Sequence, residues 1–212
     1  MGQNYERELR LVLAGKKKNV EGVIRSCSIE EKNRMRMVLK KPFFVIRVAG
    51  SGIEGSGDIF AARSDYSFPI EVKSSHSEKL YFDERLREQY NAIRRDCQRS
   101  ELLPLYAFRR KGVRGDSWRL FRVETGAVTA KQWQLAQRIP PLPTTRTGSV
   151  YLNWDDGLPL NKFISLICYD SNQHVDEPNE QTNVFDEAVK RSQIFAELER
   201  RRTESTVFKS KV

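Results

Sequence analysis

The chain has 212 residues, and its 37 Lys and Arg against 28 Asp and Glu give a formal net charge of +9. Hydrophobic residues make up 39% and charged residues 31%, which is typical of one globular domain with extensions or of two small domains. No apolar run reaches the ~18 residues that span a membrane, and the charged start MGQNYEREL does not fit a signal peptide. We therefore expect a cytoplasmic, non-secreted protein whose basic surface favours a polyanionic partner, either nucleic acid or an acidic membrane surface.

The cysteines and histidines leave few options for catalysis. Cys27, Cys97 and Cys168 are widely separated and form no CxxC pair, so neither a disulfide framework nor a zinc site is expected. Only His76 and His174 could serve as imidazole bases. If the chain is an enzyme, carboxylates and lysines must carry the chemistry.

Helices are expected in the first half of the chain. The apolar spacing predicts a helix over 3–14, and a capping box of Ser28 with Glu31 predicts a second over 29–41. The stretch between these two helices is ambiguous. A further helix is expected over 83–99, because its apolar residues fall on one face.

Strands are expected where β-branched and aromatic residues cluster, at 43–49, 58–62, 68–73, 103–110 and 117–123. The last two should pair as a hairpin. The segment GSGIEGSG (50–57) joins the first two strands, and its four glycines indicate either a loop that approaches a ligand closely or a solvated connection.

The last part of the chain carries weaker signals. Residues 124–150 contain several prolines and threonines and are interpreted as an irregular extension, while 151–168 have mixed strand and helix character. A polar linker is expected over 169–182, followed by a C-terminal helix and tail over 183–212. The apolar stripe of that helix would pack on the domain, dimerise or dock a partner.

Residues that can carry chemistry gather on two of the expected strands. Asp58 opens one strand, and twelve residues intervene before Glu71, which lies two residues from Lys73 and faces the same side. A turn between the strands would bring two carboxylates and an ammonium group together. Such carboxylates suit Mg²⁺ or Mn²⁺, and the lysine can orient a water or neutralise a phosphate oxygen, as phosphodiester hydrolysis requires. The alternative is a strand start at Asp58 and an exposed Glu71–Lys73 pair.

Several segments, in order, resemble the archaeal-type Holliday junction resolvases of the PD-(D/E)xK, restriction-endonuclease-like nuclease superfamily. These segments are ERELRLVL (6–13), FFVIRVAGSG (43–52), DIFAA (58–62), IEVKSSHSEKLYF (70–82), REQ (87–89) and SWRLFRV (117–123). The resemblance implies an α/β fold: a mixed central β-sheet flanked by helices, with a helical insert at about 15–41 and a C-terminal helical tail. The nuclease domain would then span residues 1–168.

The same resemblance implies which residues act. The family's catalytic residues match Glu6, Ser51, Asp58, Glu71 and Lys73 of this chain. Mg²⁺, with Mn²⁺ as a substitute, would be held by the two strand carboxylates and the Val72 carbonyl, while Glu6 reaches it through water or binds a second ion. Lys73 would position the attacking water, and Ser51 would contact the scissile phosphate. Gln89 matches a supporting polar residue of related nucleases.

Two departures from the family pattern affect this assignment. Gly57 stands where the family has a proline before the aspartate. A long insert separates the first helix from the first strand, which makes Glu31 on the second helix a rival of Glu6. Glu6 is favoured because GQNYEREL resembles the start of the family's helix, whereas Glu31 has a capping role as its alternative.

DNA is expected to be held by Ser51 and by a set of basic residues. The basic residues are Lys16, Lys17, Lys18, Arg47, Arg85 and Arg87. Contacts of this kind position a protein on phosphates without reading bases. The resemblance implies a homodimer that cuts opposed strands of a four-way DNA junction, with no membrane partner. The alternatives are a related nuclease for flaps, forks or duplex DNA, a non-catalytic DNA-binding module, or a protein that docks a partner through 183–202.

Overall fold

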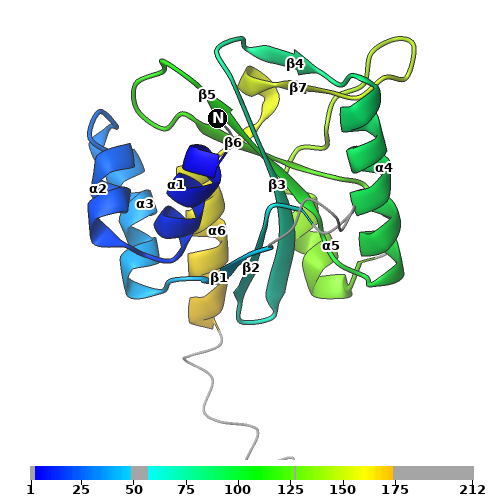
Figure 1. The fold of residues 1–212 in the computed structure, drawn as a ribbon. Helices are drawn as coiled ribbons and strands as arrows, with labels where there is room; N and C mark the ends of the chain where they lie inside the picture. Colours follow the sequence, from blue (N-terminus) through cyan, green and yellow to red (C-terminus); the bar gives the residue numbers. More distant parts are fainter. Residues whose placement is uncertain (1–2, 49–56, 127, 174–212) are drawn as a thin grey trace, which may run out of the picture. The chain divides into compact units, whose positions relative to one another are not determined.

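The computed structural model describes residues 3–48, 57–126 and 128–173. The described residues up to Ser171 belong to one compact unit. At its centre lies a mixed sheet in the order β1-β2-β3-β5-β6-β8, with helices on both faces (Figure 1). The predicted fold class, an α/β mixed sheet flanked by helices, is confirmed.

The helices are α1 (Gln3–Leu13), α2 (Lys17–Val23), α3 (Ile29–Lys40), α4 (Glu84–Arg99), α5 (Ala130–Ala136), the 3-10 helix η1 (Trp154–Asp156) and α6 (Leu160–Gln173). The strands of the main sheet are β1 (Phe44–Arg47), β2 (Ile59–Arg63), β3 (Tyr66–Ser75), β5 (Leu105–Arg110), β6 (Trp118–Arg122) and β8 (Leu158–Pro159). A separate antiparallel pair is formed by β4 (Lys79–Tyr81) and β7 (Tyr151–Asn153).

The strand connections explain why the sheet is mixed. β1, β2 and β3 form an antiparallel meander, whereas β3 pairs parallel with β5. A parallel pair needs a long crossover, and the chain makes it through β4 and α4. β5 and β6 form the antiparallel hairpin that the sequence predicted. The β3–β5 register places Glu71 beside Tyr106.

Apolar side chains alternate along the strands, so each face of the sheet has its own core. One core includes Ile70 and Val72 and is covered by α1, α2, α3, α5 and α6. The other includes Tyr106 and Phe108 and is covered by α4 with β4 and β7. None of the helices described is both long and apolar enough to cross a membrane.

The start of α3 is set by the capping box that the sequence predicted. The Ser28 hydroxyl accepts from the Glu31 N–H at 3.2 Å, and the Glu31 carboxylate accepts from the Ser28 N–H at 2.8 Å. Two backbone donors at the helix start are thereby satisfied by side chains. The Glu31 carboxylate is therefore engaged in a hydrogen bond that stabilises the start of α3.

Some elements differ from the expectations. The stretch 124–150, expected to be irregular, contains α5, and the ambiguous stretch before α3 contains α2. Both helices are short, and short helices are stable only when packing supports them, which local sequence does not show. α6 continues to Gln173, past the expected boundary at residue 168. Residues 174–212, with most of the expected linker and the C-terminal helix, lie outside the described part of the chain.

Phe163 provides a test of how α6 packs on the sheet. It is fully buried, and its ring centroid lies 6.1 Å from that of Phe43 and 5.4 Å from that of Phe68. We expect Phe163→Ala to lower the free energy of unfolding by about 3–5 kcal/mol in urea titrations. The matched control is Tyr169→Ala, because Tyr169 is on the same helix but 62% exposed. It should change the free energy by less than about 0.5 kcal/mol, and equal effects of the two variants would contradict this packing.

Candidate active site

Asp58 lies at the point where β2 separates from β3. Its N–H donates to the Ile70 carbonyl at 3.0 Å, and its carbonyl accepts from the Val48 N–H at 3.0 Å. Its Oδ2 accepts from the Val72 N–H at 2.7 Å. The carboxylate thus takes the place that a strand backbone would occupy, which fixes its position relative to β3.

Gly57 allows the close approach of Asp58 to β3. Its φ is 73°, and a Cβ at this position would lie 3.0 Å from the Ile70 carbonyl oxygen. Proline, whose ring holds φ near −65°, is excluded from this conformation. The structure therefore explains why glycine stands where the family pattern has a proline.

Glu71 and Lys73 project from the same face of β3 toward α4. The Lys73 Nζ donates to Glu71 Oε1 at 2.7 Å and to Gln89 Oε1 at 3.0 Å. Both side chains are largely buried: that of Glu71 is 12% exposed and that of Lys73 is 16% exposed. Gln89 comes from α4, so this helix fixes the position of the ammonium group.

α1 brings Glu6 to the same cluster. Its Oε2 lies 3.6 Å from Arg47 Nε, and the side chain is 15% exposed. Burial raises the pKa of Glu6, and the charge of Asp58 raises it further against the opposing effect of Arg47. Burial also raises the pKa of Glu71 despite the neighbouring Lys73, and the charges of Asp58 and Glu6 add to the rise. The carboxylates of Glu6, Asp58 and Glu71 are therefore close enough for their negative charges to repel one another.

Glu31, the rival of Glu6, lies elsewhere. Its carboxylate is held in the capping box of α3, and its charge acts on Cys27 and Arg119. The structure thus brings Glu6, and not Glu31, to Asp58 and Glu71.

The donors in this cluster are those that a hard divalent cation prefers. Carboxylates and carbonyls are the usual ligands of Mg²⁺ and Mn²⁺. Residues two apart in a strand present their backbone to the same edge, so the Val72 carbonyl faces the edge at which Ile70 bonds Asp58. Within the described ranges, no three His, Cys, Asp or Glu side chains stand ready to hold a metal. The Asp58 and Glu71 carboxylates are instead engaged by the Val72 N–H and by Lys73.

A basic hollow adjoins Glu6. It has a volume of about 190 Å³, and Arg7, Arg10 and Arg47 line it together with Glu6. Guanidinium groups are suited to neutralise phosphate, because they carry a permanent charge and several donors. The hollow can therefore receive a phosphate next to the carboxylates.

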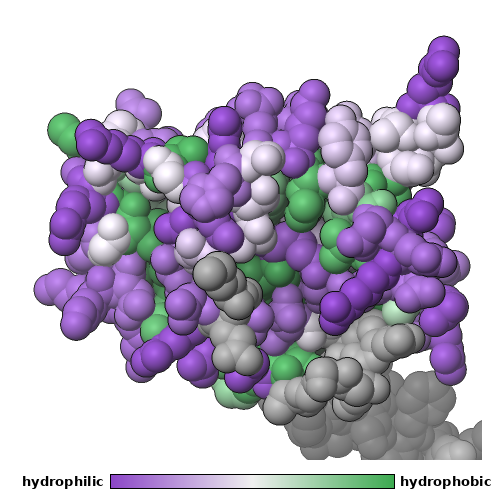
Figure 2. All heavy atoms as spheres, turned by 45° about the horizontal axis from the view of Figure 1, so that its top comes forward, coloured by the Kyte–Doolittle hydropathy of each residue, from purple (hydrophilic) through white to green (hydrophobic). Residues whose placement is uncertain are grey.

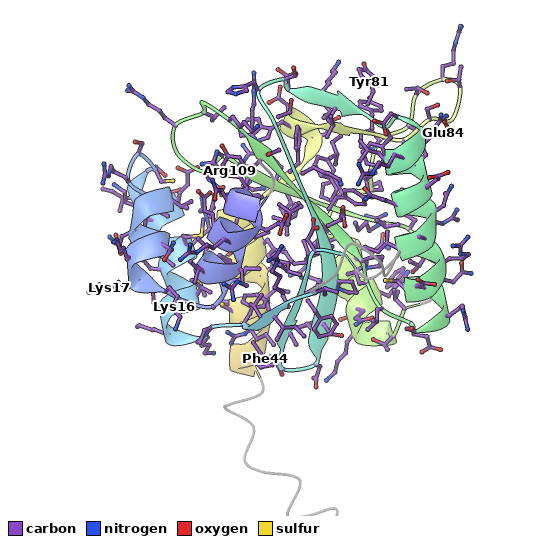
Figure 3. The ribbon with its side chains drawn as sticks, in the orientation of Figure 1. Lys16, Lys17, Phe44, Tyr81, Glu84 and Arg109 are labelled. Carbon is purple, nitrogen blue, oxygen red and sulfur yellow. The ribbon has the colours of Figure 1, made fainter. Side chains whose placement is uncertain are left out.

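The other residues predicted to bind DNA are scattered. Those that the structure describes are Lys16, Lys17, Lys18, Arg47, Arg85 and Arg87. The three lysines are exposed where α1 leads into α2, and the two arginines are exposed on α4, which packs on the opposite face of the sheet. Figure 3 shows Lys16 and Lys17 on one side of the sheet and Glu84 of α4 on the other. Of this set, the structure brings Arg47 to the carboxylates. Ser51 lies in the stretch that the structure does not describe.

A family model for archaeal Holliday junction resolvases (Hjc) matches residues 25–166. The chain belongs to the archaeal Holliday junction resolvase family. The matched range contains Asp58, Glu71, Lys73 and Gln89 but begins after α1. Among solved structures, the Archaeoglobus fulgidus Hjc, a Holliday junction resolvase from an archaeal hyperthermophile, is 21% identical with a TM-score of 0.41, over 63% of this chain and 96% of that one. No curated protein matches this chain.

The sequence did not single out Tyr106, which the fold of this resolvase-family chain places beside Glu71. Its ring centroid lies 5.4 Å from that of Phe82 and 6.4 Å from that of Tyr90. Its hydroxyl is buried and has no hydrogen-bond partner among the described residues. Burial raises the pKa of Tyr106, and the Glu71 charge adds to the rise. Only the β3–β5 register could identify it, since 35 positions separate the two residues in the sequence.

Tyr106→Phe tests whether this hydroxyl is unsatisfied. Removing a buried donor that has no partner is neutral or stabilising. We therefore expect the free energy of unfolding, measured in urea without divalent cations, to stay unchanged or to rise by up to about 2 kcal/mol. Tyr81→Phe is the control, because Tyr81 is 60% exposed and its hydroxyl reaches solvent. A loss above about 1 kcal/mol in Tyr106→Phe alone would show that the hydroxyl has a partner.

Proposed function

We propose that this chain is a structure-selective endonuclease that resolves four-way DNA junctions by metal-dependent phosphodiester hydrolysis. The observation that carries the proposal is the convergence of Glu6, Asp58 and Glu71 on Lys73 in a chain of the resolvase family. The described residues of one chain form one such cluster, whereas resolving a junction requires cuts in two opposed strands. A homodimer with two-fold symmetry supplies the second cluster.

The carboxylates account for the metal in this proposal. Mg²⁺, or Mn²⁺ as its substitute, would be held by Asp58, Glu71 and the Val72 carbonyl, with Glu6 acting through a water. When bound, an ion of this kind makes water more acidic and neutralises charge on the phosphate. Burial raises the pKa of Glu6 and Glu71, and the repulsion between the carboxylates adds to the rise. This supports the proposal, because a bound cation would relieve the repulsion.

The remaining residues position the reactants. Lys73 is held by Glu71 and Gln89, so its third donor is available to orient the attacking water. The water oxygen bonds to phosphorus and releases a proton, while a bridging P–O bond breaks and the leaving oxygen takes up a proton. Arg47 lies beside Glu6 and faces the negative charge of the phosphate.

In this proposal Glu6 is the helix residue whose carboxylate supports the metal, although the residues matched by the family model include Glu31 and not Glu6. In Mg²⁺ with a labelled mobile four-way junction, we expect Asp58→Asn and Glu6→Gln to lower the cleavage rate by at least about 100-fold, since even supporting residues around a metal contribute 10–100-fold. Junction affinity should persist. Glu31→Gln, the matched control, should cleave normally and lose at most about 1 kcal/mol of stability through its weakened cap.

The products distinguish the alternatives. Paired symmetric nicks confined to the junction support the resolvase, whereas cutting of flaps, forks or linear duplex indicates a related nuclease of other specificity. Tight binding without cleavage in either Mg²⁺ or Mn²⁺ would overturn the enzyme and leave a DNA-binding module. Loss of cleavage in Glu31→Gln rather than Glu6→Gln would transfer the helix carboxylate to Glu31.

Metal binding can be measured without turnover. A ligand of the folded state at 100 times its Kd stabilises by about 2.7 kcal/mol, so Mn²⁺ should raise the melting temperature of the unmodified protein. Asp58→Asn should abolish this rise, and Asp155→Asn, at an exposed aspartate, should keep it. EDTA should stop cleavage by the unmodified protein. An equal rise in all three proteins would refute the assignment of Asp58 as a ligand.

A further inference from the structure

A second arginine-lined hollow borders α1, with a volume of about 240 Å³. Its walls come from α1, the α2–α3 connection, β5 and the β5–β6 turn, which contribute Glu8, Arg25, Arg109 and Arg114. Residues two apart on a helix point about 200° apart. Glu8 therefore faces this hollow while Glu6 faces the hollow at the carboxylate cluster.

Arg109 is held rigidly in this hollow. Its Nε donates to Glu8 Oε1 at 2.8 Å, and its guanidinium lies 4.6 Å from the ring centroid of Tyr5 and 5.9 Å from that of Trp118. The Trp118 Nε1 donates to the same Glu8 oxygen at 2.9 Å. Figure 3 shows Arg109 beside the N-terminal end of α1. The Glu8 charge is thus compensated within the protein.

Arg25 and Arg114 complete the wall without acidic partners. Both are exposed, and within the residues that the structure describes neither forms an ion pair. The turn that carries Arg114 lies against the α2–α3 connection, since a Cβ on Gly115 would be 3.6 Å from the Ser26 carbonyl oxygen. Three arginines therefore face a hollow whose lining carboxylate is already paired. Such a hollow attracts an anion.

We propose that this second hollow binds a backbone phosphate of the junction DNA, on the same strand as the phosphate at the carboxylate cluster. This inference rests on the proposed function, because that function identifies the ligand as junction DNA. A helix is about 10 Å across, so a DNA strand that crosses α1 would need only a few nucleotides to place one phosphate in each of the two hollows. Hydrophilic side chains predominate on the face that carries this end of α1 (Figure 2).

The proposed role of the site is to hold the strand in register with the carboxylates. Phosphate contacts fix the position of a protein on DNA without reading sequence, which suits an enzyme that recognises the shape of a junction. Glu8 and the whole of α2 lie before the residues matched by the family model, so the site depends on elements outside that match.

The test measures junction binding in the Asp58→Asn background, so that cleavage does not interfere. The double variant Arg25→Gln/Arg114→Gln should bind the four-way junction about 10-fold more weakly, with the slope of log K against log salt reduced by about one to two. Arg25→Lys/Arg114→Lys keeps both charges and should retain most of the slope. The matched control is Arg138→Gln/Arg146→Gln, which removes two exposed arginines elsewhere. Melting temperatures of all variants confirm that they fold.

The outcomes separate the two proposals. An affinity and slope equal to those of the control double variant would overturn the phosphate site and leave the proposed function intact. Failure of the Asp58→Asn protein itself to bind the junction would instead overturn the proposed function. A selective loss in Arg25→Gln/Arg114→Gln, largely restored by lysine, would establish the second phosphate contact.

Discussion

The hydrogen bond from the Val72 N–H to Asp58 Oδ2, 2.7 Å long, holds the candidate site in place. β2 pairs with β3 only as far as Ile70, while β3 continues to Ser75. Beyond that point a side-chain carboxylate, not a strand, satisfies the backbone of β3. The separation of the two strands therefore exposes a carbonyl edge and places Asp58 beside Glu71. Structure and chemistry depend on the same bond, because a shift of Asp58 would leave a backbone donor unpaired.

The cost of assembling this cluster is electrostatic. Burial and mutual repulsion raise the pKa of Glu6 and Glu71, and Arg47 and Lys73 offset only part of this effect. The proposed cation and phosphate would offset this repulsion, and proteins commonly accept such local destabilisation where function requires it. The Tyr106 hydroxyl, beside Glu71 on the next strand, likewise has no hydrogen-bond partner among the described residues.

α1 lies between the carboxylate cluster and the second arginine-lined hollow. One side of this helix presents Glu6 to a hollow with Arg47, and the other presents Glu8 to a hollow with Arg109. The helix precedes the range matched by the family model, and α3 stands between it and β1 in the chain. The capping box occupies Glu31 on α3, so the carboxylate that reaches Asp58 comes from the earlier helix. Glu31, on the helix closest in sequence to β1, therefore has a structural role in the cap of α3.

The sequence by itself determined the local features of this protein. Strand periodicity placed Glu71 and Lys73 on one face, the capping box marked the start of α3, and the order of motifs indicated the family. These signals lie within a few residues of one another, and short-range backbone geometry is enough to interpret them. The tertiary structure alone brought Glu6, and not Glu31, to Asp58 and Glu71. It also placed Tyr106 beside Glu71, formed α5, and brought Arg25 and Arg109 to one hollow. Each of these depends on packing between segments far apart in the chain, which no local pattern of residues encodes.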